Sequence, residues 1–177
     1  HQIPIVEGYG LSEASPVVTK NPFRGVRKPG SIGLPIPNVE VSIQDEGGKI
    51  LGPDETGEVC VRGGNVMMGY WNNPEATRAM IDADGWLNTG DTARISETGH
   101  IYITGRLKEM LIVGGENVFP REIEEVLNKH DSVKASGVVG KPDPLRGELP
   151  IAFVELKDGA HFDEKSIRAW CRQHLAG

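Results

Sequence analysis

The sequence predicts a mixed α/β fold (an α+β arrangement) in two parts. Short stretches in which apolar and polar residues alternate, bounded by glycine-rich turns, fill the region from about residue 29 to residue 104. After residue 109 the pattern changes to apolar strands separated by amphipathic helices. With 38% hydrophobic and 25% charged residues, the 177 residues suffice for one complete domain or for parts of two. We place the boundary at residues 105–109.

The strand-rich part contains three predicted strands and one short helix. Residues 39–43 alternate between apolar and polar side chains, and two acidic residues and two glycines follow at 45–48, which is typical of a strand that ends in a hairpin turn. Similar patterns over residues 58–62 and 100–104 predict two further strands. Between these two, an asparagine in the N-cap position and a proline at the first helical position predict a helix over about residues 74–81.

The second part is predicted to begin with a strand at residues 110–113 and a helix that starts at Pro120. Strands follow at 133–140 and 149–156, and Asp163 stands at the N-cap of a last helix. Each helix has one packing face, formed by Ile123, Val126 and Leu127 in the first and by Ile167, Trp170, Cys171 and His174 in the second. Strands and amphipathic helices in this order predict a small α/β domain.

Composition argues against several classes of function. Nineteen basic and 25 acidic residues give a formal net charge of −6, so the chain has no overall positive field to attract nucleic acid or anionic lipid. No apolar run approaches the ~20 residues that a membrane-spanning helix needs. The five histidines are scattered without metal-ligand spacing. Cys60 and Cys171 lie in apolar patterns and are predicted to be buried free thiols, which favours a reducing compartment.

Residues 7–13 form the first candidate binding loop. The sequence EGYGLSE places a glycine on each side of Tyr9, where a backbone without side chains can approach a ligand closely. Ser12 and Glu13 follow, so that an aromatic ring, a hydroxyl and a carboxylate lie in one short loop. Such a loop can hold a base, a phosphate and a metal ion. From composition alone, a polar turn without a ligand explains it equally well.

Three further segments carry candidate ligand-binding groups. Asp91 follows a glycine turn and offers two acceptor oxygens to a vicinal diol such as a ribose, although a solvated turn carboxylate has the same pattern. Arg106 offers a planar donor fork to a phosphate or sugar, or is an ordinary charge in a linker. Residues 114–120 bring small residues to the start of a helix, where backbone N–H groups can meet an extended or anionic ligand; the alternative is a plain loop.

The order and spacing of these motifs resemble the adenylate-forming superfamily, which includes acyl-CoA synthetases, firefly-type luciferases and peptide-synthetase adenylation domains. The matching segments are YGLSE, GYWNNPEAT, DGWLNTGD and GRLKEMLIVGGENVFPREIEEVL. The resemblance covers essentially the whole chain. It implies that residues 1–104 are the end of a large AMP-binding N-terminal domain, with the strand-rich subdomain at about 29–104. Residues 105–109 would be a hinge, and residues 110–177 an incomplete small C-terminal domain.

The resemblance also implies a role for each motif residue. Tyr9 would stack on adenine, Ser12 would touch the phosphates, and Glu13 would help to hold the Mg²⁺ that neutralises ATP. Asp91 would accept both ribose hydroxyls, and Arg106 would bind ribose or phosphate. Serine at the position where the family more often has threonine keeps the hydroxyl. The other residues assigned to the ATP or AMP site are Gly8, Gly10 and Asn117.

The segments after residue 106 are implied to serve the second step of the reaction. Lys108 falls at the family's hinge, where backbone torsions change as the small domain swings between two catalytic arrangements. The pantetheine tunnel of coenzyme A is assigned to Gly114, Gly115 and Glu116. A charged segment resembles the family's GxPDxxxGExP pattern and consists of Lys141, Asp143, Arg146, Gly147 and Glu148. Its basic members are expected either to meet the coenzyme A nucleotide or to be exposed charges in a loop between strands.

The expected parent enzyme is a carboxylate–CoA ligase, of the fatty-acyl type, that uses ATP, Mg²⁺ and coenzyme A. It would form acyl-AMP first and acyl-CoA second, in the cytoplasm, with peripheral membrane contact left open and no nucleic-acid partner. The alternatives are a peptide-synthetase adenylation domain, a luciferase-type monooxygenase and a catalytically silent nucleotide-binding module. The family's phosphate loop and its C-terminal catalytic lysine are absent from the 177 residues, and both ends resemble cuts. The chain alone is therefore expected to be inactive.

Overall fold

The computed structural model describes residues 5–175, which contain three β-sheets and three α-helices. The mixed α/β fold expected from the sequence is confirmed. The chain divides into two compact units, residues 1–104 and residues 105–177. None of the helices in the described part of the chain is long and apolar enough to cross a membrane.

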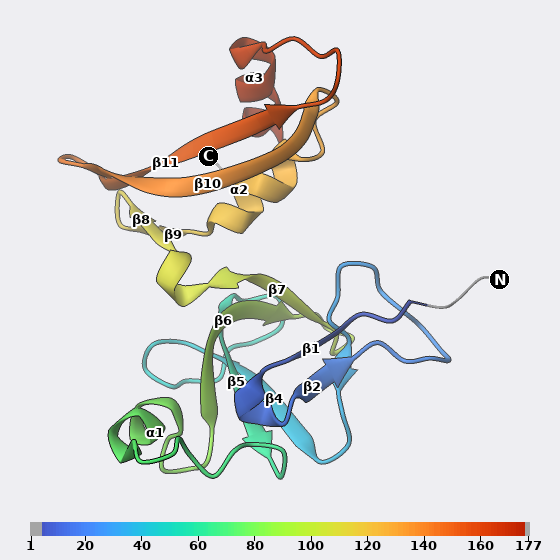
Figure 1. Ribbon diagram of the computed structural model, residues 1–177, viewed down its shortest axis with the longest axis vertical. Helices are drawn as coiled ribbons and strands as arrows, with labels where there is room; N and C mark the ends of the chain where they lie inside the picture. Colours follow the sequence, from blue (N-terminus) through green and yellow to red (C-terminus); the bar gives the residue numbers. More distant parts are fainter. Residues whose placement is uncertain (1–4, 176–177) are drawn as a thin grey trace. The chain divides into compact units, whose positions relative to one another are not determined.

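The first unit is built mainly from two antiparallel sheets (Figure 1). The smaller sheet has the order β1-β2-β3, and its strands are β1 (Gly8–Gly10), β2 (Val17–Lys20) and β3 (Leu34–Pro35). The larger sheet has the order β4-β5-β6-β7, with the strands β4 (Val39–Gln44), β5 (Gly57–Gly63), β6 (Leu87–Ile95) and β7 (Ile101–Arg106). A short 3₁₀ helix, η1 (Ser12–Ala14), joins β1 to β2, and the helix α1 (Pro74–Met80) precedes β6.

A hydrophobic core lies where the inner faces of these strands meet. Its fully buried members are Ala14, Val18, Ile43, Val59, Val61, Leu87, Ala93 and Ile101. They come from η1 and from strands of both sheets, and Tyr9 packs against them. Burial of each valine, leucine or isoleucine side chain among them stabilises the fold by about 1.5–3 kcal/mol. The helix α1 is fixed by its own cap, because the Asn73 side chain accepts a hydrogen bond from Ala76 N at 3.1 Å, as its sequence predicts.

The two sheets are joined directly by backbone hydrogen bonds. Ile32 N donates to Ile101 O at 2.9 Å, and Ile101 N donates to Gly33 O at 3.1 Å. Gly33 has a positive φ of 89°, and a Cβ placed on it would lie 2.1 Å from the carbonyl carbon of Lys20. Only glycine fits here without displacement of the backbone.

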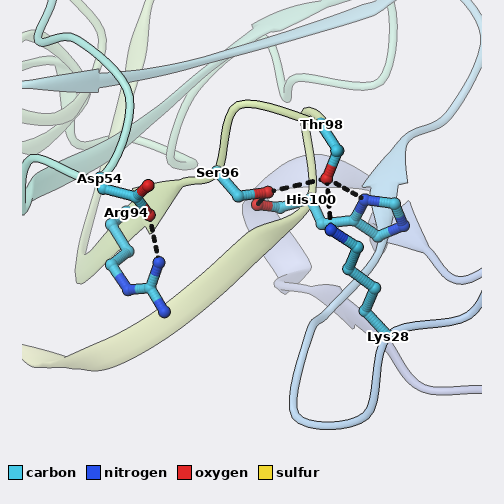
Figure 2. A network of polar contacts seen from close by, with 6 residues as sticks. All are labelled: Lys28, Asp54, Arg94, Ser96, Thr98 and His100. Carbon is cyan, nitrogen blue, oxygen red and sulfur yellow. Dashed lines mark hydrogen bonds and ion pairs between the residues drawn. The ribbon is translucent and has the colours of Figure 1, made fainter.

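A polar network fastens the same loop to the turn between β6 and β7 (Figure 2). Lys28 Nζ donates to Thr98 Oγ1 at 2.6 Å, and Thr98 Oγ1 lies 3.2 Å from His100 Nδ1. Ser96 N and the Ser96 hydroxyl both donate to His100 O, which closes the turn. His100 is buried, so these contacts hold it where the loop and the turn meet.

The second unit contains a four-stranded sheet and two helices. The sheet has the order β10-β11-β8-β9, with the strands β8 (Leu111–Val113), β9 (Glu116–Val118), β10 (Val133–Asp143) and β11 (Gly147–Leu156). The helices are α2 (Pro120–Leu127) and α3 (Glu164–His174), and a 3₁₀ helix, η2 (Leu107–Glu109), precedes β8. The core consists of Leu127, Val133, Val138 and Ile167, and Trp170 Nε1 donates to Val126 O at 2.8 Å to tie α3 to α2.

Most predicted elements are present, with three differences. The strands β10 and β11 extend to Asp143 and from Gly147, because β10 is an edge strand and tolerates Pro142. Five strands were not predicted from the sequence: β1, β2, β3 and β9, which have only two to four residues each, and β6, which has nine. His174 was predicted on the packing face of α3 but is exposed, although its ring stacks on Trp170 with centroids 3.9 Å apart.

Gly33→Ala is expected to destabilise the first unit far more than Gly30→Ala. Both glycines have a positive φ, which costs alanine about 1–2 kcal/mol. A Cβ at Gly30 meets nothing within 4 Å, whereas at Gly33 it overlaps the backbone, so the total loss there is expected to be about 3–4 kcal/mol. Urea denaturation of the two variants measures the difference. An equal loss in the free energy of unfolding for Gly33→Ala and Gly30→Ala would contradict the steric argument.

Candidate functional site

The first predicted loop brings the Tyr9 ring to a carboxylate of the other sheet. The Tyr9 hydroxyl donates to Asp91 Oδ2 at 2.7 Å, across 82 positions of sequence. The glycines beside Tyr9 serve the neighbouring strand: a Cβ would lie 2.8 Å from Thr19 O at Gly8 and 1.8 Å from Pro16 O at Gly10. The sequence alone predicts that these glycines admit a ligand, but the close approach of the chain at Pro16 and Thr19 is a sufficient reason for both.

Ser12 and Glu13 lie on η1, directly after β1. Ser12 is exposed and Glu13 is half-buried. Glu13 Oε1 accepts a hydrogen bond from the Tyr70 hydroxyl at 2.8 Å, and Glu13 O accepts one from Met67 N at 2.8 Å. Asn65 Nδ2 donates to the carbonyl oxygens of Ala14 and Val17, both at 3.1 Å. The loop is therefore held at several points by the segment 65–70.

Asp91 lies in a bulge of β6, not in a solvated turn. In the pairing of β5 with β6, Glu58 faces Thr92 and Cys60 faces Asn88, so three residues of β6 oppose one residue of β5. Gly90 takes a φ of 73°, and its N–H donates to Glu58 Oε1 at 2.8 Å. The Thr89 hydroxyl donates to Val59 O at 2.8 Å and accepts from Asp91 N at 3.2 Å.

These contacts define the surroundings of the Asp91 carboxylate. Asp91 is 6% exposed, and burial of a carboxylate is favourable only when hydrogen bonds replace its water. The bulge changes the direction of the strand at this point, and the Tyr9 hydroxyl is one of the donors that the carboxylate meets. An aromatic ring and a buried carboxylate are thus placed side by side.

Arg106 and Lys108 lie at the start of the second unit. Arg106 is the last residue of β7 and is exposed, and Lys108 is exposed in the middle of η2. Met110 N donates to Arg106 O at 3.1 Å and to Leu107 O at 3.2 Å, which closes the single turn of η2. The backbone at Lys108 therefore belongs to a one-turn element between two strands.

The glycine pair after β8 is part of a hairpin, and its predicted position at a helix start is wrong. Gly114 and Gly115 have φ values of 62° and 90° and connect Val113 to its pairing partner Glu116. Two consecutive residues with positive φ are typical of a two-residue hairpin turn. Glu116 and Asn117 are exposed on β9, which separates the glycines from α2.

The charged segment 141–148 lies at the tip of the hairpin formed by β10 and β11. Asp143 Oδ1 accepts from Leu145 N at 3.0 Å and from Arg146 N at 2.9 Å, and Gly147 has a φ of 80°. Glu148 Oε2 accepts from Ile112 N at 3.1 Å. The two acidic side chains thus shape the hairpin, while Lys141 and Arg146 are exposed.

The structure unites part of the predicted site and adds residues that the sequence analysis did not assign. Tyr9 meets Asp91, and Ser12 and Glu13 lie on the element that follows Tyr9. The unassigned residues are Glu58, Asn65, Tyr70 and Thr89. Tyr70 and Thr89 lie within the quoted segments GYWNNPEAT and DGWLNTGD, so a signal existed for both. Glu58 and Asn65 are recognisable only once the strands are paired, because their role is to hold backbone groups.

The carboxylate of Glu13 is a suitable oxygen ligand for a magnesium ion that binds together with a nucleotide. Within residues 5–175 there is no cluster of three or more histidine, cysteine or acidic side chains that would hold a resident ion. Mg²⁺ commonly binds through one or two carboxylates together with substrate phosphates and water. A half-buried carboxylate with one oxygen already oriented matches that requirement.

Comparisons with known proteins now define the family. The model of the AMP-binding enzyme family matches residues 1–71, and that of the AMP-binding enzyme C-terminal domain matches residues 122–177. These matches define the class as AMP-binding enzymes. The chain belongs to the adenylate-forming superfamily, as its motifs predict.

The chain is similar to several coenzyme A ligases. It is 49% identical over 173 residues to the long-chain-fatty-acid–CoA ligase of Bacillus subtilis (strain 168), covering 97% of this chain and 31% of that protein. It is 43% identical over 175 residues to the 2-succinylbenzoate–CoA ligase of Geobacillus kaustophilus, covering 98% and 35%. The crystal structure of ATP-bound MatB from Rhodopseudomonas palustris matches with a TM-score of 0.91 and 38% identity, covering 97% of this chain and 34% of that one. The chain thus spans about a third of the length of these relatives.

Cys60 lies next to the bulge but does not have the properties of a nucleophile. It is 1% exposed, and its Sγ lies 3.3 Å from Asn88 Oδ1. Burial, together with the negative charges of Glu58 and Asp82, raises the pKa of the Cys60 thiol from 9.0 to about 12. The thiol therefore stays protonated at neutral pH.

The two cysteines are expected to differ in reactivity with a thiol reagent. At pH 8, Cys60 in the folded chain should react at least about 100-fold more slowly than Cys171, which is half-buried and has a pKa that burial raises less. The variants Cys171→Ala and Cys60→Ala show which cysteine gives the fast phase of the reaction and which gives the slow phase. A fast phase that persists in Cys171→Ala would contradict the expectation.

The raised pKa of Cys60 also predicts how stability depends on pH. Because the folded pKa of Cys60 lies above the ordinary value, the free energy of unfolding should fall as pH rises from 9 to 12.

Proposed function

We propose that this chain is part of an ATP-dependent carboxylate–CoA ligase of the fatty-acyl type. The enzyme would join a carboxylic acid to the AMP moiety of ATP with release of pyrophosphate, and then transfer the acyl group to the thiol of coenzyme A with release of AMP. The observation that carries the proposal is the hydrogen bond between Tyr9 and Asp91, which unites the aromatic residue of one motif with the carboxylate of another. The similarity to coenzyme A ligases over almost the whole chain supports it.

Tyr9 and Asp91 supply the two groups that recognise a nucleoside. An aromatic ring offers a stacking surface to adenine, and a carboxylate accepts hydrogen bonds from both hydroxyls of a ribose. Hydrogen bonds to a charged acceptor are roughly twice as strong as neutral ones. Burial of Asp91 excludes water from this contact, which strengthens it further.

Ser12, Glu13, Arg106 and Asn117 are assigned to the phosphate end of the nucleotide. The exposed Ser12 hydroxyl donates to a phosphate oxygen, and the guanidinium of Arg106 offers its donor fork to ribose or phosphate. Asn117 supplies a further polar side chain. Glu13 would hold Mg²⁺, which, when bound with the nucleotide, neutralises phosphate charge.

The thiol-transfer step is assigned to the second unit. Lys108 lies in the single turn of η2, where a change of few backbone torsions redirects the chain that follows, and we assign it the hinge. Gly114 and Gly115 form a turn in which a Cβ on either residue would meet nothing within 4 Å, so that they offer an unobstructed backbone to an extended pantetheine chain, beside Glu116. Lys141 and Arg146 are exposed and can meet the nucleotide of coenzyme A.

Two other functions remain as alternatives within the proposal. A peptide-synthetase adenylation domain would use the same nucleotide residues but deliver the acyl group to a carrier protein. A silent module would bind AMP without chemistry. The relatives named as coenzyme A ligases favour the ligase, which we place in the cytoplasm with peripheral membrane contact as a further possibility. Since the 177 residues match only about a third of each relative, we propose that they do not adenylate an acid alone.

Asp91→Ala is expected to abolish adenylation in the longer polypeptide that contains this chain. ATP–pyrophosphate exchange would be measured with acetate and with medium-chain, long-chain and aryl acids. Loss of the buried acceptor should lower the exchange rate at least about 100-fold with the preferred acid. Asp54→Ala is the matched control, because Asp54 is an exposed aspartate in the same unit and pairs with Arg94 at the surface.

The acid that supports exchange identifies the substrate class, and formation of its coenzyme A thioester separates a ligase from a carrier-dependent domain. Absence of exchange with every acid, in a folded polypeptide that still binds AMP, would favour the silent module. Equal losses in Asp91→Ala and Asp54→Ala would contradict the assigned role of Asp91.

A further inference from the structure

The Glu13 carboxylate is held by a residue to which no role has been assigned. The Tyr70 hydroxyl donates to Glu13 Oε1 at 2.8 Å, across 57 positions of sequence. No other described residue donates a hydrogen bond to Oε2 of the same carboxylate. One oxygen is therefore fixed by the protein, and the other remains available on a half-buried side chain.

The segment that carries Tyr70 is itself fixed. Met67 N donates to Glu13 O at 2.8 Å, so the two segments are joined through the backbone as well as through the side chains. Tyr70 N donates to the Thr77 hydroxyl at 2.9 Å, and that hydroxyl donates to Asn73 O at 3.0 Å at the start of α1. A phenol on such a segment can define the direction of the carboxylate that it meets.

The charge of the pair is suited to a cation. The Tyr70 hydroxyl donates its hydrogen bond to Glu13 as a neutral group. A neutral donor orients a carboxylate without cancelling its charge, whereas a lysine or arginine at the same place would compete with a bound cation. The Glu13 side chain makes no salt bridge with another described residue.

We propose that Tyr70 is a positioning residue that turns Oε2 of Glu13 toward the divalent cation carried by the nucleotide phosphates. The inference rests on the proposed function, in which Glu13 contacts that cation. Tyr70 acts through Glu13 and does not touch the nucleotide. Its removal should therefore weaken the contribution of Mg²⁺ to ATP binding and leave recognition of the nucleoside unchanged.

The test compares nucleotide affinities of Tyr70→Phe in the longer polypeptide that contains this chain. Calorimetry would give the Kd of ATP with Mg²⁺, of ATP with a chelator, and of AMP. We expect the gain in ATP affinity that Mg²⁺ provides to fall by about 5- to 10-fold in Tyr70→Phe. The Kd of AMP should stay within about 2-fold, because Tyr9 and Asp91 are untouched.

Two further variants separate positioning from a structural role. In Glu13→Gln the charge is lost, so adding Tyr70→Phe to it should not reduce the Mg²⁺-dependent gain further. Trp71→Phe is the matched control, since this neighbouring aromatic residue is 92% exposed, and it should behave as the unaltered protein does. Thermal unfolding of every variant shows whether the fold is retained.

The possible results separate the positioning role of Tyr70 from the proposed ligase function. An unchanged Mg²⁺-dependent gain in Tyr70→Phe, or equal weakening of ATP and AMP, would overturn the role of Tyr70 while leaving the ligase in place. Full additivity of Tyr70→Phe and Glu13→Gln would overturn it as well. If the unaltered polypeptide bound neither AMP nor ATP, the proposed function itself would fail, and the inference with it.

Discussion

The backbone contact between Gly33 and Ile101 is the constraint on which the first unit depends. It joins the small sheet, which carries Tyr9, to the large sheet, which carries Asp91. Because a side chain at Gly33 would overlap the backbone of Lys20 and Asn21, the chain can pass this close to the end of β2 and still pair with Ile101 only with glycine there. A hydrogen bond of 2.7 Å between residues on different sheets tolerates little displacement, so the candidate nucleoside site depends on a glycine that belongs to none of the recognised motifs.

The bulge in β6 shows how a sequence motif becomes a directed side chain. A regular strand would pair Gly90 and Asp91 with β5 and set their directions by simple alternation. Instead, Glu58 and Thr89 take over the hydrogen bonds that the ladder has lost, and Gly90 adopts the positive φ that the irregularity requires. The motif TGD therefore supplies three different functions: a hydroxyl that bonds to the neighbouring strand, a flexible backbone, and a buried carboxylate.

The sequence predicted most of the longer elements because their signals are local, but the nine-residue strand β6 was not among them. Alternation identified β4 and β5, and the caps at Asn73 and Asp163 identified the starts of two helices. The short strands β1, β2, β3 and β9 carry no periodic signal, since they exist only through their partners. For the same reason the motif residues could be chosen from their order in the chain, whereas Glu58 and Asn65, which bind backbone groups of distant segments, could not.

Tyrosine occurs at two points of the candidate site, and in both its hydroxyl bonds to a carboxylate from another motif: Tyr9 to Asp91 and Tyr70 to Glu13. Under the proposed function, in which Glu13 contacts a cation, the arrangement at Glu13 has a physical reason. A carboxylate that must bind a cation needs a fixed direction and a full charge, and these requirements conflict if a cationic side chain provides the orientation. A phenol resolves the conflict because its rigid ring and two side-chain torsions set the direction while its hydroxyl stays neutral. The segment GYWNNPEAT thus acquires a reason for its tyrosine that lies in the charge of a residue 57 positions away.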